Sequence, residues 1–247
     1  MKNFVGVIDS GVGGLTVLKQ LQREFPFCNY LYLADSAYCP YGTKQPQEIQ
    51  RRVEILINFL QDNGAQAAVI ACNTASVFAK SLREKFTLPI YDVIVPTCQL
   101  VTSVTRTKRV ALLATNATVN SRAYQRELQN QGITVTTFPC SSFVPFVEAN
   151  LTDASECIEA VHNSLWQLPD SNVDVVILGC THFPLLRKQI APYVNGAKIV
   201  ECCTDFQPRT YSSKQALETV FFTTGAEKQA NFASQWFGEV NFIHVDL

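Results

Sequence analysis

Short apolar segments alternate with amphipathic stretches along this chain, and no other feature of the sequence constrains its fold as strongly. The apolar segments predict strands at 4–8, 30–34, 67–71, 109–114, 134–138, 173–178 and 198–201. The segments between them predict helices at 14–24, 46–63, 74–85, 120–131, 155–166 and 184–190. Strands with few polar residues suit sheets that are covered on both faces. The alternation therefore predicts an α/β protein with mainly parallel sheets flanked by helices.

Two distant parts of the chain resemble each other. AVIACNT at 68–74 and VVILGCT at 175–181 each run from a buried strand into a cysteine and a polar residue. A weaker likeness joins GVIDS at 6–10 to ALLAT at 111–115, and the two offsets are 108 and 105 residues. So long a period indicates two similar halves rather than a short repeat. We expect two pseudo-twofold-related domains, residues 1–96 with 205–247 and residues 97–204.

Composition narrows the class of protein. With 47% hydrophobic residues in 247, the chain can bury a large core, and its formal net charge of -1 favours neither nucleic acid nor an anionic membrane as a partner. Asp9 interrupts the first apolar segment too early for a signal peptide, and no apolar run is long enough to cross a bilayer. We expect a soluble, cytoplasmic protein.

The chain has nine cysteines, an odd number without a CxxC pair. This pattern favours neither a disulfide framework nor a metal site, and most of these thiols are expected to be small core residues. Cys72 and Cys180 differ from the others because both follow a strand in matching surroundings. A helix start would lower the pKa of such a thiol, and His182 lies two residues beyond Cys180.

Four turns from strand to helix carry the other candidate residues, because ligands of open α/β sheets bind beyond the carboxyl ends of the strands. The turns are 9–14, 72–74, 115–118 and 180–182. Their hydroxyl, amide and backbone N–H groups suit a small anionic ligand. The first turn, DSGVGG, is neither a GxGxxG nor a Walker A loop, so the nucleotide interpretation is weak.

Each of these residues also has a purely structural interpretation. The glycines would then only permit a tight turn. Asp9 would bond the N–H groups of its turn, unless its strand lies beside that of Cys72. His182 would be a core histidine, and Glu148 a surface carboxylate on a helix. Its place beside Cys180 favours an acid–base role for His182.

Seven segments together resemble the glutamate racemase family, within the aspartate/glutamate racemase superfamily. They are GVIDSGVGGLTV at 6–17, ADSAYCPYGTK at 34–44, VIACNTAS at 69–76, LLATNATVNSRAY at 112–124, FVPFVE at 143–148, VILGCTHFPLL at 176–186 and, more weakly, FFTTG at 221–225. The resemblance implies two α/β domains with the active site between them, and a homodimer. It further implies an isomerase that needs no cofactor, neither pyridoxal phosphate nor a metal, and whose D-glutamate supplies bacterial peptidoglycan synthesis and so cell shape.

The resemblance also implies the roles of individual residues. Cys72 and Cys180 become the catalytic pair, assisted by Asp9 and His182 respectively, with Glu148 near His182. The residues implied to contact the substrate are Asp9, Ser10, Tyr41, Gly42, Asn73, Thr74, Thr118, Thr181 and His182. The chain departs from the family pattern at Tyr38, where arginine is common, at Ala117, where glycine is common, before Pro96, and at 201–203.

Inverting a carbon without a cofactor requires one group to remove a proton and another to deliver one from the opposite face. We expect the two thiols to do this for glutamate, with their sulfurs roughly 6–8 Å apart across the substrate. Three alternatives remain. One is a hydrolase or amidotransferase with Cys180 as nucleophile and His182 as base. The others are a non-catalytic amino-acid-binding protein and a racemase for aspartate or hydantoins.

Overall fold

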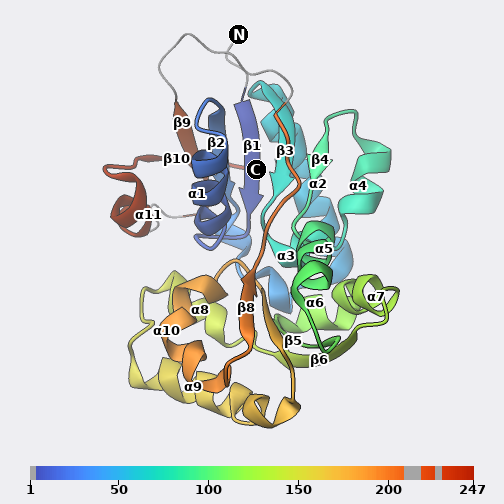
Figure 1. The fold of residues 1–247 in the computed structure, drawn as a ribbon. Coiled ribbons are helices and arrows are strands. Elements are labelled where there is room, and N and C mark those ends of the chain that lie inside the picture. The colour runs from blue at the N-terminus through green and yellow to red at the C-terminus, as the bar shows by residue number, and fades with distance from the viewer. Residues whose placement is uncertain (1–3, 209–217, 226–229) are drawn as a thin grey trace.

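The chain forms two separate parallel sheets (Figure 1). The computed structural model describes residues 4–208, 218–225 and 230–247. The first sheet has the order β10-β9-β2-β1-β3-β4. Its strands are β1 (Phe4–Asp9), β2 (Asn29–Ala34), β3 (Ala65–Ile70), β4 (Ile90–Tyr91), β9 (Thr219–Thr223) and β10 (Phe242–His244). The second sheet has the order β6-β5-β7-β8. Its strands are β5 (Arg109–Ala114), β6 (Thr134–Pro139), β7 (Val175–Gly179) and β8 (Lys198–Glu201).

The two sheets share one strand order, because β2-β1-β3-β4 corresponds to β6-β5-β7-β8. Cys72 follows β3 and Cys180 follows β7, so the two thiols occupy corresponding positions. Asp9 ends β1, and Thr115 directly follows its counterpart β5. The predicted α/β class with two similar halves is confirmed.

Helices surround both sheets, as Figure 1 shows. They are α1 (Leu15–Glu24), α2 (Pro46–Asp62), α3 (Asn73–Ser76), α4 (Ala79–Lys85), α5 (Ile94–Val104), α6 (Asn116–Ser121), α7 (Ala123–Gln129), α8 (Phe143–Glu148), α9 (Ser155–Leu165), α10 (Arg187–Ile190) and α11 (Ala230–Phe237). Helix α2 shows why such segments are helical, since Ile49, Val53, Leu56 and Leu60 form one buried face. Short 3₁₀ turns join several elements, among them η1 (Ser36–Tyr38), η2 (Tyr41–Thr43) and η4 (Phe183–Leu186).

Three predicted helices are divided in the structure. The segment 74–85 forms α3 and α4, and the segment 184–190 forms part of η4 and then α10. The segment 120–131 is broken at Arg122, whose φ of 58° is left-handed, so that α6 ends and α7 begins there. Helix α6 begins earlier than predicted, because the Thr115 hydroxyl accepts a hydrogen bond from the Thr118 N–H (3.3 Å).

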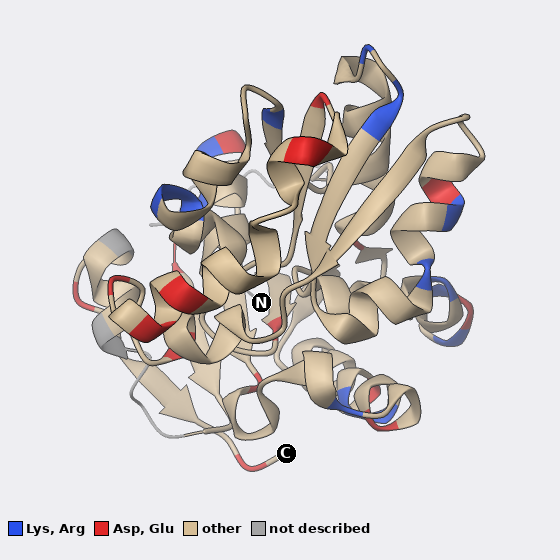
Figure 2. Ribbon diagram, turned by 90° about the horizontal axis from the view of Figure 1, so that it is seen from below, with Lys and Arg blue, Asp and Glu red and all other residues tan. Residues whose placement is uncertain are grey.

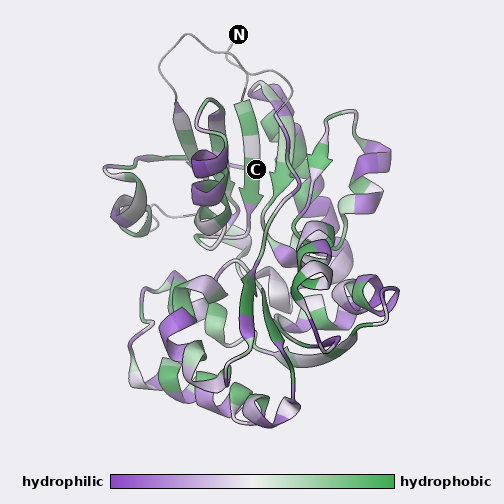
Figure 3. Cartoon of the chain, viewed as in Figure 1, coloured by the Kyte–Doolittle hydropathy of each residue, from purple (hydrophilic) through white to green (hydrophobic). Residues whose placement is uncertain are grey.

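Apolar strands form the interior of both halves, and Figure 3 shows them as the most hydrophobic parts of the chain. One core cluster extends from Val7 of the first sheet to Leu113 and Leu178 of the second, so the halves share buried contacts. Basic and acidic residues are interspersed over the outer helices (Figure 2). Within the residues described, no helix is both long and apolar enough to span a membrane.

The chain passes from the first sheet to the second between β4 and β5 and returns after β8. We propose the domain division stated above, residues 1–96 with 205–247 and residues 97–204, because it assigns every strand to the domain of its own sheet. Residues 1–3, 209–217 and 226–229 of the first domain lie outside the described part of the chain.

Candidate active site

One small cavity between the two halves brings both candidate thiols together. Cys72 and Cys180 line it with Ser10, Pro40, Tyr41, Gly42, Asn73, Thr74, Thr115, Val144, Thr181 and His182. Its volume is about 10 Å³, which is room for about one water molecule. Three predicted site residues, Asp9, Thr118 and Glu148, lie behind this lining and contact it. The structure thus gathers the residues predicted from four different turns into one closed site.

Cys72 is buried, with one carboxyl group near it. Its thiol donates to the Ser10 hydroxyl (3.8 Å). The fully buried Asp9 ends the neighbouring strand β1. Burial raises the pKa of the Cys72 thiol, and the charge of Asp9 raises it further. The backbone N–H of Ala75 at the start of α3 does lower this pKa, as expected, but burial and Asp9 outweigh it.

Burial acts on Asp9 in the same direction. It raises the pKa of this carboxyl group, although the positive charge of His182 and the N–H groups of Gly11 and Gly14 oppose the shift. A carboxyl group with a raised pKa is a better proton acceptor than an ordinary one. Asp9 is therefore suited to exchange a proton with a neighbouring thiol.

The surroundings of Cys180 contain an imidazole instead. His182 Nδ1 lies 3.7 Å from the sulfur, and its Nε2 lies 2.6 Å from Glu148 Oε1. Burial alone would lower the pKa of His182, but its interactions with Cys180 and Glu148 outweigh burial and raise it well above 6.5. Burial would likewise raise the pKa of Glu148, yet His182 and the Val12 N–H lower it below 4.5. The pair is thus an imidazolium and a carboxylate at neutral pH.

The glycine turn 11–14 makes room for these acid–base groups. A side chain at Gly11 would collide with Glu148, one at Gly13 with His182, and one at Gly14 with Asp9. The amides of the turn are also occupied. The Gly11 N–H donates to Asp9 Oδ2 (3.0 Å) and the Val12 N–H to Glu148 Oε1 (2.8 Å). These two N–H groups therefore hold protein carboxylates rather than a ligand anion, which corrects the expectation for this turn.

Hydroxyl groups connect the two halves across the cavity. Thr181 donates to Asp9 Oδ1 (3.1 Å), which ties the Cys180 turn to the first sheet. Thr74 from the first half contacts Thr115 (3.0 Å) and Thr118 (3.2 Å) from the second. A side chain at Gly42 would meet Thr115. These contacts place polar side chains from both halves at the junction.

Several supporting residues escaped sequence analysis. The Tyr124 hydroxyl donates to Asn73 Oδ1 (2.6 Å), and Asn73 Nδ2 donates to Cys202 Sγ (3.0 Å). Cys202 therefore orients a predicted site residue, although its pairing with Cys203 gave no such signal. Thr115 was noted only as part of its turn. The contacts of Asn73 with Tyr124 and Cys202 join residues 51 and 129 positions apart, so local spacing does not indicate them.

Tyr41 and Tyr38, both singled out from the sequence, contact an ion pair between Asp35 and Arg52. The Tyr41 hydroxyl donates to Asp35 (2.5 Å), and Asp35 is held by the buried Arg52 at 2.8 Å. The Arg52 guanidinium lies over the ring of Tyr38, 4.0 Å from the ring centroid. The role of Tyr38 is to cover this ion pair.

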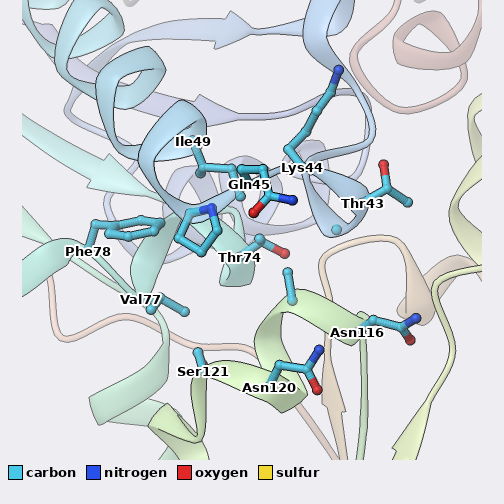
Figure 4. A pocket seen from close by; sticks show the side chains of 13 residues that line it. Thr43, Lys44, Gln45, Ile49, Thr74, Val77, Phe78, Asn116, Asn120 and Ser121 are labelled. Carbon is cyan, nitrogen blue, oxygen red and sulfur yellow. The ribbon is translucent and has the colours of Figure 1, made fainter.

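A larger cavity of about 660 Å³ adjoins the closed one and shares Gly42 and Thr74 with it. Figure 4 shows that Gln45 and Ile49 from the first half face Asn116 and Asn120 from α6 across this space. It is large enough for a small-molecule ligand. Thr74 lines both this cavity and the thiol cavity. Ala117 also lines the larger cavity.

Comparison with known proteins agrees with this arrangement. Residues 5–204 match the model of the family described as Asp/Glu/Hydantoin racemase. The glutamate racemase of Listeria monocytogenes serotype 4a is 36% identical, with 100% of this chain and 99% of that protein covered. A glutamate racemase isoform of Bacillus anthracis superimposes with a TM-score of 0.89 at 28% identity, covering 99% and 98% of the two chains. The glutamate racemase of Francisella tularensis, solved in complex with D-glutamate, gives a TM-score of 0.86 at 28% identity and covers 99% and 97%.

The family model covers the second sheet, most of the first and all four turns of the thiol cavity, and the full-length relative exceeds one third identity. This chain belongs to the Asp/Glu/Hydantoin racemase family.

Proposed function

We propose that this racemase interconverts L-glutamate and D-glutamate without a cofactor, using Cys72 and Cys180 as two acid–base groups on opposite faces of the substrate. The observation that carries the proposal is that thiols from corresponding strand ends line one cavity between the halves. The names of the full-length relatives support glutamate as the substrate.

The two thiols divide the proton transfers. One thiolate removes the α-proton while the other thiol delivers a proton from the opposite side, and the roles exchange in the reverse reaction. Following the family resemblance, Cys72 acts on D-glutamate and Cys180 on L-glutamate. Asp9 takes up the proton of Cys72, and the His182 imidazolium stabilises the Cys180 thiolate. A thiolate formed against a raised pKa, as at Cys72, is a strong base, which suits so weakly acidic a proton.

Proton transfer alone does not account for the rate, because each positioned acid–base group contributes roughly 10²–10⁴-fold. Negative charge develops on the α-carboxylate as the proton leaves, and hydrogen bonds aimed at it lower the barrier. The remaining candidates are the side chains of Ser10, Asn73, Thr74, Thr118 and Thr181, since the Gly11 and Val12 amides hold carboxylates. We assign substrate binding to these side chains with Tyr41 and Gly42.

Glutamate is far larger than the 10 Å³ cavity, so binding requires its walls to separate. The adjoining 660 Å³ cavity provides the approach, and the Thr74–Thr115–Thr118 contact is the wall that must part. Closing this wall again around the substrate excludes water from the carbanion. We further propose a cytoplasmic homodimer whose D-glutamate supplies bacterial peptidoglycan synthesis.

Polarimetry tests the proposal. The purified chain, dialysed against a chelator and given L-glutamate without added cofactor, should bring the optical rotation to zero. Unchanged rotation with correctly folded protein would disprove racemisation of glutamate, and a parallel sample with L-aspartate measures specificity. A covalent acyl-enzyme detected by mass spectrometry would instead favour the hydrolase alternative.

A further inference from the structure

Cys39, Glu148 and His182 form a cluster of possible metal ligands near Cys180. The proposed reaction assigns no role to Cys39. A sulfur of Cys39, a carboxylate oxygen of Glu148 and a ring nitrogen of His182 all lie within 4.8 Å of one another. They come from three separate elements, since Cys39 follows η1, Glu148 ends α8 and His182 follows β7. Thiolate, carboxylate and imidazole are the three ligand types that zinc takes in proteins.

Two members of the cluster, Cys39 and Glu148, line a second opening that shares Pro40 and Val144 with the thiol cavity. A hollow of about 400 Å³ is lined by Ser36, Cys39, Pro40, Val144, Pro145, Glu148 and Ala149. The Glu148 side chain is 20% exposed, whereas that of His182 is 2% exposed. A hydrated cation can therefore reach Cys39 and Glu148 from this side, and a water in the hollow can complete a four-coordinate site.

We propose that Cys39, Glu148 and His182 form a binding site for Zn²⁺ or a similarly thiophilic divalent cation, and that the bound cation inhibits the racemase. The inhibitory part rests on the proposed function, whereas the binding part does not. When the cation coordinates Nε2 of His182, this nitrogen no longer forms its hydrogen bond with Glu148. The fixed, neutralised ring then cannot supply the positive charge that stabilises the Cys180 thiolate.

Little rearrangement is required. Tetrahedral zinc with bonds of about 2.0–2.2 Å to N and O spaces these ligands at about 3.3 Å, so the 2.6 Å contact between His182 and Glu148 must widen by about 0.7 Å. Glu148 is already fixed by the Val12 N–H (2.8 Å), which holds one oxygen in place. Two protons leave to solvent, one from the Cys39 thiol and one from His182 Nε2, and no electrons are transferred.

Electrostatics predicts how binding depends on pH. The Cys39 thiol must lose its proton before its sulfur can coordinate a cation. A coordinated divalent cation removes such a proton outright. Affinity should therefore rise with pH, because binding releases protons.

Spectroscopy with cobalt tests binding separately from activity. Chelator-treated protein in a thiol-free reductant is titrated with Co²⁺, and zinc affinity is measured by competition. We expect one Co²⁺ per chain with a thiolate-to-cobalt charge-transfer band, and a loss of zinc affinity of at least about 100-fold in Cys39→Ser and Cys39→Ala. Cys203→Ser, a half-buried cysteine outside the cluster, is the matched control and should bind as the unmodified chain does.

Turnover under zinc tests inhibition. Zinc should suppress racemisation in the unmodified chain and in Cys203→Ser but not in Cys39→Ser, which should retain its basal turnover. Unchanged zinc affinity in both folded Cys39 variants would overturn the site, because other thiols must then hold the metal. Binding at Cys39 without inhibition would overturn the inhibitory role. A chain that binds cobalt but never racemises glutamate would contradict the proposed function and leave the site standing.

Discussion

The Cys72 and Cys180 sides of the cavity occupy corresponding places in two similar sheets, yet their chemistry differs. Cys72 has the fully buried Asp9 and the Ser10 hydroxyl beside it. Cys180 has His182, whose partner Glu148 reaches a solvent-filled hollow with 20% of its side chain exposed. The shared fold fixes where the two sulfurs lie, whereas the residues around each sulfur set how its proton is exchanged. On the Cys180 side, His182 and Glu148 form a hydrogen-bonded route from the thiol to the surface.

The largest loss of activity is expected from replacing the two thiols, which occupy equivalent places on the two sides of the cavity. Cys72→Ser and Cys180→Ser should each reduce kcat for glutamate at least about 10³-fold in both directions, because a serine hydroxyl is a far weaker acid than a thiol. Steady-state polarimetry from each enantiomer measures this. Cys203→Ser is the control. Normal turnover in Cys72→Ser or Cys180→Ser would contradict a mechanism that uses both thiols.

The next effect should separate the two sides. Asp9→Asn and His182→Asn should each lower kcat/KM by about 10²-fold. The enantiomers have equal free energy in water, so kcat/KM must fall by one factor in both directions, and the asymmetry has to be sought in isotope effects. We expect His182→Asn to increase the primary deuterium effect with L-[2-²H]glutamate, and Asp9→Asn that with D-[2-²H]glutamate. Equal changes with both substrates would show that the partners are not assigned to separate thiols.

The smallest effect concerns the free energy of unfolding. It is expected to have opposite signs for Glu148 on the Cys180 side and for Asp9 on the Cys72 side. The raised pKa of His182 contributes stability below 6.5 that is lost as pH rises through the higher folded value. The lowered pKa of Glu148 contributes stability above 4.5 that is lost as pH falls. Glu148→Gln should therefore cost about 1–3 kcal/mol, with the largest loss between pH 4.5 and 6.5.

Asp9 should behave in the opposite way. Its raised pKa means that the folded protein loses stability as pH rises above 3.8, so Asp9→Asn should leave the chain more stable at neutral pH. Urea unfolding of both variants between pH 4 and 9 provides the comparison. Destabilisation of Asp9→Asn at neutral pH would contradict the burial argument.

Sequence patterns were most informative where structure is local. Strands β5 and β8 have the predicted bounds, and the likeness of the two cysteine segments predicted their corresponding positions. Strands β4, β9 and β10 were missed because each is short or lies far along the chain from its partner. The break at Arg122 was also missed, since apolar periodicity does not report a left-handed residue. Helices α5, α8 and α11 were not predicted either.

The same distinction between local patterns and long-range contacts applies to the candidate site. Residues in the four turns were found, because parallel strands end at one edge of a sheet. The contact of Cys202 with Asn73 spans 129 residues, and the Cys39 cluster joins three elements, so neither leaves a local pattern. The occupied amides of the glycine turn were equally invisible, because their acceptors include Glu148, 136 residues from Val12.

The most direct test of two opposed thiols follows the hydrogen on the α-carbon. In D₂O, with L-glutamate and no added cofactor, a single turnover should yield D-glutamate carrying one deuterium at Cα, while unreacted L-glutamate keeps its protium. Mass spectrometry after separation of the enantiomers reads both species. D-glutamate that retains the original protium would show that one group carries the proton across, and would contradict the account.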